Sequence, residues 1–398
     1  MENRITPNYE FAPMIPQRGL GSRVWDVEGK EYVDLAGGIA VNALGHCHPK
    51  LIEALDGQAR RLWHISNVYA NLPAMELAQK LTDRTFADRV FFSNSGAEAN
   101  EAALKMARKF QSDRFGDKKT EIVSALRSFH GRSLFTVSVG GQAKYSDGFG
   151  PLPQSIAHVP FNDPQALREA VGERACCVIL EPIQGESGAL PATKEYLQAA
   201  REACDAAGAL LIFDEVQCGM GRSGELYAYM RYGVEPDILT SAKALGGGFP
   251  IGATLAKERV ARCFAPGSHG STFGGNPLAC AVACAAFDLI DREETRANVR
   301  RQSDRLMERL RRVGEELSLF KDVRGMGLLV GAELSDEFAG KAKALRLECL
   351  KQGAMVLQAG SDVLRFAPSL LISDEDLDEG LKRVGEGARA FAQAARGA

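Results

Sequence analysis

Residues 209–217 read Ala-Leu-Leu-Ile-Phe-Asp-Glu-Val-Gln, an apolar run followed at once by two acids. Such a short apolar run predicts a strand that is buried on both faces, as in parallel sheets. Helical stretches alternate with similar runs at residues 90–92, 121–125, 157–160, 176–180, 238–241 and 252–256. The alternation predicts an α/β fold with about seven strands. Ligands of such sheets bind beyond the carboxyl ends of the strands, so candidate functional residues are sought there.

The overall composition is that of an enzyme-sized globular protein, with 398 residues, 45% of them hydrophobic and 25% charged. The longest apolar run, residues 278–287, is shorter than the roughly 18–20 residues that a membrane span requires. The first residues contain no apolar signal segment, so we expect a cytoplasmic location. The formal net charge of −3 disfavours nucleic acid and anionic membranes as partners.

Changes of sequence pattern along the chain predict three regions. Residues 1–45 contain short strand patterns and are assigned to an N-terminal segment associated with a small domain. Residues 46–275 carry the alternating pattern and form the large domain, and residues 276–398 form a smaller α+β domain. The nine cysteines are an odd number without a CxxC pair, which indicates reduced core thiols. His46 and His48 flank Cys47, but no second cluster completes a metal site, so we expect none.

The first chemical signal is the segment Ser95-Gly96-Ala97, which joins the strand at 90–92 to a helical pattern. Free backbone N–H groups and the helix dipole make such a turn a site for an anion. The alternative reading is an ordinary helix N-cap.

The acids Asp214 and Glu215 at the end of a strand also occur in phosphate-loop ATPases, where they bind magnesium. Those enzymes require the motif GxxxxGK[ST], which this chain lacks. Residues 219–224 match the dinucleotide pattern GxGxxG, but no strand directly precedes them and no long helical pattern follows. We therefore interpret that match as a loop.

Two further residues complete a recognisable set. Lys243 follows the strand at 238–241 and precedes three glycines, and Phe129 follows the strand at 121–125. A desolvated lysine amine can form a Schiff base, and an aromatic ring can stack on a heterocycle. Together with the anion turn and Asp214, these groups fit pyridoxal 5′-phosphate, because its phosphate, ring face, ring nitrogen and aldehyde each require one of them.

The motifs resemble those of the class III aminotransferases that use pyridoxal phosphate, in particular the acetylornithine and succinylornithine aminotransferases. The resemblance runs nearly end to end and in the same order, through residues 37–49, 95–102, 129–132, 181–186, 214–217, 242–248 and 271–277. It implies the aspartate aminotransferase-like fold, fold type I of the pyridoxal-phosphate enzymes. That fold has a large domain with a mostly parallel seven-stranded sheet and a smaller α+β domain.

The resemblance also assigns roles at the cofactor. Lys243 would form the Schiff base, Asp214 would pair with the ring nitrogen, and Phe129 would cover a ring face. Gln217 would approach the ring hydroxyl, and Thr272 would come from the neighbouring subunit, which implies a homodimer with shared active sites. The full cofactor-binding set is Ser95, Gly96, Ala97, Phe129, Asp214, Glu215, Val216, Gln217, Lys243 and Thr272.

The implied reaction moves the δ-amino group of an N2-acylornithine to 2-oxoglutarate, in arginine metabolism. Arg132 would hold the α-carboxylate of the acylornithine, and Arg365 that of glutamate. Glu186 would cover Arg365 when the other substrate is bound, and Ser271 would lie near the substrate. The segment Gly140-Gly141-Gln142 leans toward succinylornithine. The alternatives are an ornithine or 4-aminobutyrate aminotransferase, with the same cofactor residues, and a non-catalytic protein that retains the fold.

Overall fold

The computed structural model describes residues 4–397, and it confirms the α/β prediction. A seven-stranded sheet has the spatial order β4-β12-β11-β10-β7-β5-β6. Strand β12 is antiparallel to both of its neighbours, and the other pairs are parallel. In chain order the strands are β4 (Arg89–Ser93), β5 (Glu121–Ala125), β6 (Ile156–Val159), β7 (Ala175–Leu180), β10 (Leu210–Asp214), β11 (Ile238–Ser241) and β12 (Gly252–Ala256).

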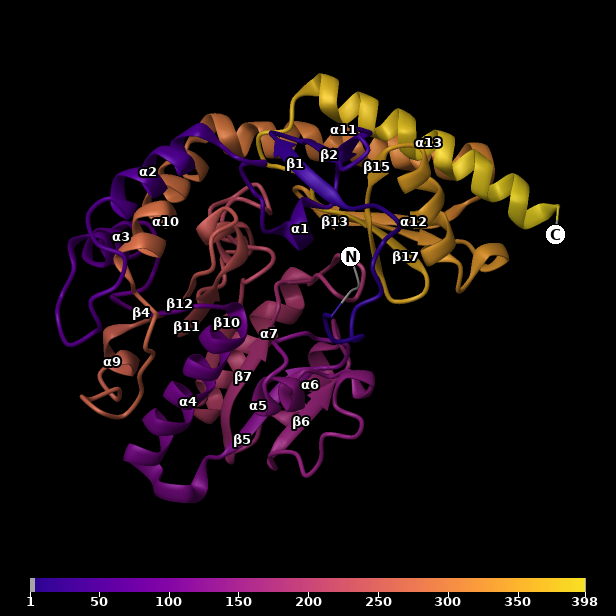
Figure 1. Ribbon diagram of the computed structural model, residues 1–398. Helices are drawn as coiled ribbons and strands as arrows, with labels where there is room; N and C mark the ends of the chain where they lie inside the picture. The colour runs from indigo at the N-terminus through magenta and orange to yellow at the C-terminus, as the bar shows by residue number, and fades with distance from the viewer. Residues whose placement is uncertain (1–3, 398) are drawn as a thin grey trace.

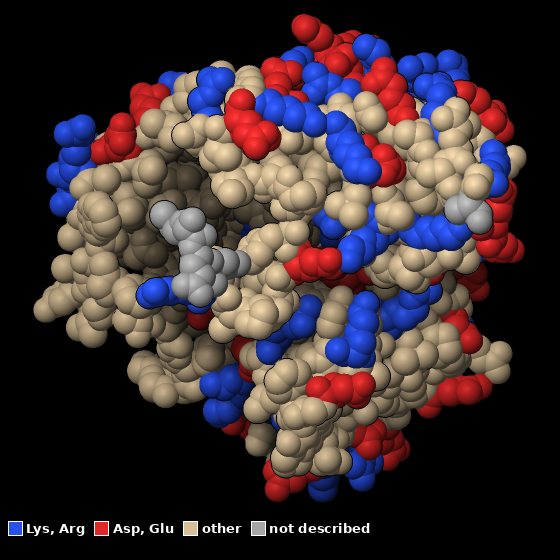
Figure 2. Space-filling view, turned by 45° about the vertical axis from the view of Figure 1, so that its right-hand side comes forward, with Lys and Arg blue, Asp and Glu red and all other residues tan. Residues whose placement is uncertain are grey.

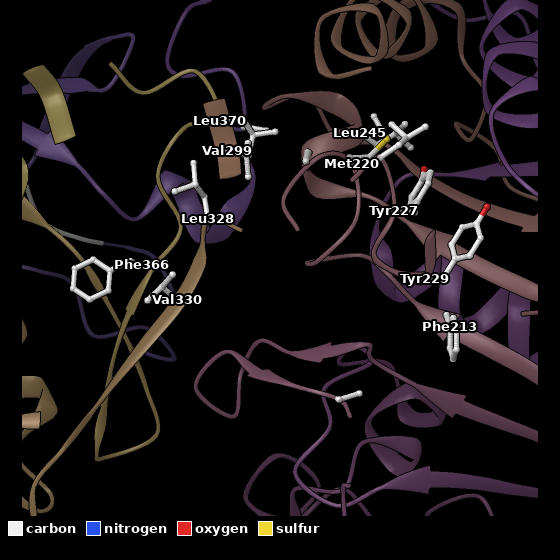
Figure 3. Packing of buried hydrophobic residues seen from close by; sticks show 14 of the residues in the cluster. Phe213, Met220, Tyr227, Tyr229, Leu245, Val299, Leu328, Val330, Phe366 and Leu370 are labelled. Atoms are coloured by element: carbon white, nitrogen blue, oxygen red, sulfur yellow. The ribbon is translucent and has the colours of Figure 1, made fainter. Parts of the chain in front are cut away.

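Helices cover both faces of this sheet, as the apolar runs require (Figure 1). In β10, Leu210 and Ile212 pack in one apolar cluster with residues of α4 (Gly96–Phe115). Leu211 and Phe213 belong to the other cluster, with residues of α7 (Lys194–Ala207), and Phe213 lies near Tyr227 and Tyr229 in Figure 3. This alternation follows from the two-residue period of a strand. A doubly covered sheet leaves the strand ends as the place for a ligand.

The remaining strands form smaller sheets. One has the order β1-β2-β3-β15, and so joins the N-terminal segment to a strand near residue 354. A second has the order β13-β14-β17-β16, and β8 pairs with β9. Their bounds are β1 (Pro16–Leu20), β2 (Arg23–Asp26), β3 (Glu31–Asp34), β8 (Ile183–Gln184), β9 (Leu190–Pro191), β13 (Phe320–Met326), β14 (Leu329–Leu334), β15 (Ala354–Met355), β16 (Leu357–Ala359) and β17 (Val363–Phe366). The predicted domain limits at residues 45/46 and 275/276 stay predictions.

Two long helices follow residue 276. Helix α10 (Pro277–Ile290) packs against α2 (Pro49–Ala59) and α3 (Leu72–Asp83), beside the large sheet. Helix α11 (Glu293–Leu317) packs against α13 (Asp374–Arg396). The other helices are α1 (Gly37–Ala40), α5 (Leu134–Val139), α6 (Pro164–Ala170), α8 (Ala228–Tyr232), α9 (Glu258–Ala261) and α12 (Ala342–Lys351), with short 3-10 turns η1 (Gly116–Lys118), η2 (Ala143–Tyr145), η3 (Lys243–Gly246) and η4 (Asp336–Phe338).

Charged side chains of both signs are interspersed over the face seen in Figure 2. Between α11 and α13, for example, Arg305 pairs with Asp374 and Asp378. Residues 219–224 lie in turns, as their interpretation as a loop requires. None of the helices within residues 4–397 is long and apolar enough to cross a membrane.

Candidate active site

The structure brings most of the predicted site residues to one cavity of about 390 Å³. The cavity lies where the carboxyl ends of β10 and β11 meet the N-terminus of α4. This is the position that the fold favours for a ligand. The predicted residues that line it are Ser95, Gly96, Ala97, Phe129, Arg132, Asp214, Val216, Gln217 and Lys243.

The N-terminus of α4 supplies both a cap and an open anion cradle. Ser95 Oγ accepts a hydrogen bond from the Glu98 N–H at 3.2 Å, so its side chain is the N-cap. The N–H groups of Gly96 and Ala97 are in the first helical turn, where no intrahelical acceptor exists. A Cβ on Gly96 would lie 2.6 Å from Val216 Cγ1, so the close packing of these two walls requires glycine. The backbone N–H groups remain available to an anion.

Asp214 lies buried at the end of β10 and is held by several donors. Its Oδ2 accepts from Asn100 Nδ2 at 2.7 Å and lies 2.8 Å from His130 Nδ1. Its Oδ1 accepts from the Val216 N–H at 3.0 Å. These donors stabilise the ionised carboxylate and fix its orientation. An oriented carboxylate can keep a bound heterocyclic nitrogen protonated.

Asn100 connects three segments and was missed by the sequence analysis. Its amide donates to the His130 carbonyl at 2.8 Å and to Asp214, and its Oδ1 accepts from Thr240 Oγ1 at 2.7 Å. The signal was a buried polar residue in a helix whose neighbouring positions, Ala99 and Ala103, are apolar and small. Asn100 therefore ties α4, the Phe129 loop and two strand ends together.

Lys243 follows β11 and lines the cavity. Its φ of 48° is in the left-handed region, a strained conformation that clusters at functional sites. No hydrogen bond or ion pair joins its amine to another residue in the part of the chain that the structure describes. Burial lowers its pKa from the usual value of 10.5, although Glu186 and Asp214 act in the opposite direction. Burial thus favours the neutral, nucleophilic amine.

Arg365 and Glu186 lie just behind the cavity wall, where both contact Gln217, a residue that lines the cavity. Arg365, 2% exposed on β17, places Nη1 2.6 Å from Glu186 Oε1 and 3.1 Å from Gln217 Oε1. Gln217 Nε2 also donates to Glu186 Oε1 at 3.2 Å. Burial by itself would raise the pKa of Glu186, but Arg365 and the other partners outweigh it and lower that pKa. The pair is therefore ionised, and Glu186 covers the arginine.

Arg132, in contrast, has no acidic partner within residues 4–397. Its guanidinium carbon lies 3.9 Å from the centre of the Tyr145 ring and 5.6 Å from that of Phe129. The two rings hold an arginine that faces the cavity with its charge unneutralised. It is therefore ready to bind a carboxylate.

A second buried acid, Glu181, supports the loop of Phe129 and was also missed. Its Oε2 accepts from the Phe129 N–H at 2.9 Å, and its Oε1 accepts from the Gly185 N–H at 3.3 Å. Burial, together with the nearby charge of Asp214, raises the pKa of Glu181 well above its usual range.

Besides Arg365 and Glu186, which lie behind the cavity wall, three further predicted residues do not line the cavity. The Glu215 carboxylate instead accepts from the N–H groups of Ala228 and Tyr229 at 2.6 and 2.8 Å, and burial raises its pKa to about 7. Its side chain is thus a cap for α8, and the predicted place of Glu215 among the cofactor-binding residues stays a prediction. Ser271 and Thr272 border a separate hollow of about 300 Å³, so their predicted roles through a neighbouring subunit stay predictions.

Comparison with known proteins agrees with this geometry. The family described as aminotransferase class-III matches residues 5–386. Acetylornithine aminotransferase from Neisseria meningitidis is 63% identical over 396 residues, 100% of both chains. A Pseudomonas aeruginosa protein named succinylornithine transaminase/acetylornithine aminotransferase is 57% identical, covering 99% of this chain and 96% of that one.

Solved structures of known aminotransferases share the fold. N-acetylornithine aminotransferase from Stenotrophomonas maltophilia is 46% identical, with a TM-score of 0.85 over 96% of this chain and 97% of the other. Ornithine aminotransferase from Toxoplasma gondii is 33% identical, with a TM-score of 0.94 over 98% and 94%. Together with the match of the family over nearly the whole chain, these likenesses confirm the resemblance that the sequence motifs indicated, and the chain belongs to the class-III aminotransferases.

Proposed function

We propose that the protein transfers the δ-amino group of an N2-acylornithine to 2-oxoglutarate, giving N-acylglutamate 5-semialdehyde and glutamate, with pyridoxal 5′-phosphate as cofactor. One observation carries the proposal: the cavity of Lys243 and Asp214 is lined by one open arginine, Arg132, and a second arginine, Arg365, lies behind its wall covered by Glu186. The relatives named for acetylornithine and succinylornithine support it.

The cavity residues fit the cofactor group by group. Gly96 and Ala97 offer free N–H groups for a phosphate, at a turn so closely packed that a Cβ on Gly96 would contact Val216. Asp214 offers a fixed carboxylate for the ring nitrogen, and Phe129 offers a ring face. When bound, the cofactor supplies an electron sink for bonds at the carbon that carries the amine.

Lys243 is the residue that holds and moves the proton. As a neutral amine, favoured by burial, its Nζ can accept a proton from the δ-carbon of the acylornithine. The same Nζ, once protonated, would pass that proton on to the bound cofactor rather than back to the δ-carbon, as amino-group transfer requires. Because no described residue engages its amine, Lys243 has no competing partner for this task.

The two arginines explain how one site accepts two different substrates in turn. An acylornithine presents its α-carboxylate far from the reacting δ-carbon, and the open Arg132 binds it. Glutamate carries a carboxylate directly beside its reacting carbon, and this group replaces Glu186 at Arg365. Glu186 therefore prevents Arg365 from attracting the α-carboxylate of an acylornithine.

We further propose a homodimer, supported by exposed apolar side chains on residues 63–75. Val68 is 82% exposed and Leu72 is 78% exposed, and Phe273, next to Thr272, is 60% exposed. Such a concentration of apolar surface is typical of an interface. A partner that covers it would bring its Thr272 toward this cavity.

A cytoplasmic location agrees with the state of the cysteines, all nine of which are free thiols. Most of them are buried in apolar surroundings, among them Cys176 and Cys177 on β7. Buried unpaired thiols are usual in a reducing compartment.

The experiment compares single turnovers of the cofactor-loaded protein with N2-acetylornithine, N2-succinylornithine, ornithine and 4-aminobutyrate. The change in the cofactor's visible absorption reports each rate, and 2-oxoglutarate then regenerates the starting spectrum. We expect both acylornithines to exceed the others by at least about tenfold, or 1.4 kcal/mol at the transition state. Faster reaction of ornithine or 4-aminobutyrate would overturn the proposal, and the absence of any spectral change would favour a non-catalytic protein.

A further inference from the structure

A second cation lies close to Arg132, outside the residues that line the cavity. Lys144, on η2, places its Nζ 4.6 Å from the centre of the Tyr145 ring. Arg132 lies against the same ring at 3.9 Å, so one aromatic ring carries two positive charges. The ring itself packs edge-on against Phe129, a residue of the cavity wall, with centroids 5.7 Å apart.

Neither charge is balanced by an acid. No ion pair joins Arg132 or Lys144 to a carboxylate in the part of the chain that is described, residues 4–397. Two cations that share a ring repel each other, since like charges at this separation interact unfavourably. Anionic groups within reach of both cations would offset this repulsion and gain attraction from each.

The segment that carries Lys144 is fixed to the wall of the site. Gln142 Nε2 donates to the carbonyls of Arg127 and Ser128 at 3.1 Å each. The Gly141 N–H donates to Ser128 Oγ at 3.2 Å, and a Cβ on Gly141 would lie 2.6 Å from the Ala125 carbonyl oxygen. The segment is therefore preorganised, which reduces the cost of binding a ligand there.

The geometry points to Lys144 as the residue that recognises a second carboxylate, that of a succinyl group on the substrate, while Arg132 holds the α-carboxylate. The assignment rests on the proposed function and deepens it. In an N2-succinyl amino acid about six bonds separate the two carboxyl carbons, and the two cationic groups, 3.9 and 4.6 Å from the centre of one ring, lie close enough together to meet both carboxylates. An acetyl group has no such carboxylate, so Lys144 gives the succinyl substrate an advantage that the acetyl substrate lacks.

The test is the substitution Lys144→Met in the cofactor-loaded protein. We expect kcat/KM for N2-succinylornithine to fall about fivefold, which corresponds to the upper end of the contribution that an exposed ion pair makes to binding. The kcat/KM for N2-acetylornithine should stay unchanged. Lys144→Arg should keep the succinyl preference. The control is Lys118→Met, which removes an exposed lysine on η1, beyond the end of α4 that is far from the cavity. It should change kcat/KM for neither substrate.

A binding measurement separates recognition from chemistry. N2-succinylnorvaline and N2-acetylnorvaline lack the δ-amine and cannot react, so calorimetry gives their Kd directly. Lys144→Met should weaken the binding of the succinyl compound by the same factor and leave the binding of the acetyl compound unchanged. If Lys144→Met leaves the ratio of the two kcat/KM values unchanged, or lowers the affinity for both compounds equally, the role of Lys144 is overturned while the proposed function stands. If the unaltered protein turns over neither acylornithine, the proposed function fails and this assignment fails with it.

Discussion

Replacement of Asn100 by alanine tests the network beneath the cavity. The side-chain amide makes three hydrogen bonds, to Asp214 Oδ2, to the His130 carbonyl and from Thr240 Oγ1, at 2.7, 2.8 and 2.7 Å. Each buried hydrogen bond contributes about 0.5–1.5 kcal/mol, and partners left unsatisfied add to the loss. We therefore expect Asn100→Ala to lower the free energy of unfolding by about 2–4 kcal/mol.

The assay is urea denaturation of the cofactor-free protein at fixed protein concentration, so that cofactor binding does not contribute. Asn8→Ala, at an exposed position, is the control and should change the free energy of unfolding by less than about 0.5 kcal/mol. A double-mutant cycle with Thr240→Val should give a coupling of about 0.5–1.5 kcal/mol, since the two side chains share a hydrogen bond. A loss below about 0.5 kcal/mol for Asn100→Ala, with no coupling, would refute the structural role of this amide.

Three further predictions concern the site and the interface. Lys243→Met should reduce transamination by at least about 10²-fold, and it should make the cofactor-free protein more stable, because burial lowers the pKa of this amine from 10.5. That gain should shrink as the pH rises toward 10.5, where the lysine of the unfolded chain also loses its proton, and equal stabilities in urea at pH 7 would contradict it. Glu186→Gln should lower KM for glutamate about tenfold by uncovering Arg365. Because the pKa of Glu186 lies below 4.5, its contribution to stability is present above that pH and is lost as the pH falls further. In a pH series, the unfolding midpoint should therefore fall less at acid pH in the variant than in the unaltered protein. Leu72→Asp should convert the dimer to monomers in analytical ultracentrifugation and abolish activity, and a variant that remains an active dimer would place the interface elsewhere.

Much of the large sheet could be predicted because its strands are short apolar runs between helices. The predicted strand at 209–213 begins and ends one residue before β10, and the run at 252–256 matches β12 in full. The antiparallel direction of β12 could not be predicted, since pairing depends on the path of the chain in space. The break between α10 and α11 is marked locally only by residues 291–292 inside an otherwise helical pattern.

The site was predictable where a residue directly follows a strand, as with Asp214 and Lys243. Asn100, Thr240 and Glu181 escaped prediction because their roles arise only when segments far apart in sequence meet beneath the cavity. The side chain of Glu215 points away from that of Asp214, because neighbouring side chains at a strand end point to opposite sides. Its contacts with the start of α8 show the result of that alternation.

The central claim is that the cavity of Lys243 and Asp214 holds the cofactor. The most direct measurement reduces the cofactor-loaded protein with borohydride, which fixes the cofactor to the amine that carries it, and then maps the modified peptide by mass spectrometry. We predict a single modified residue, Lys243, and loss of the modification in Lys243→Met. Modification at another lysine, or none in a protein that binds the cofactor, would contradict the account.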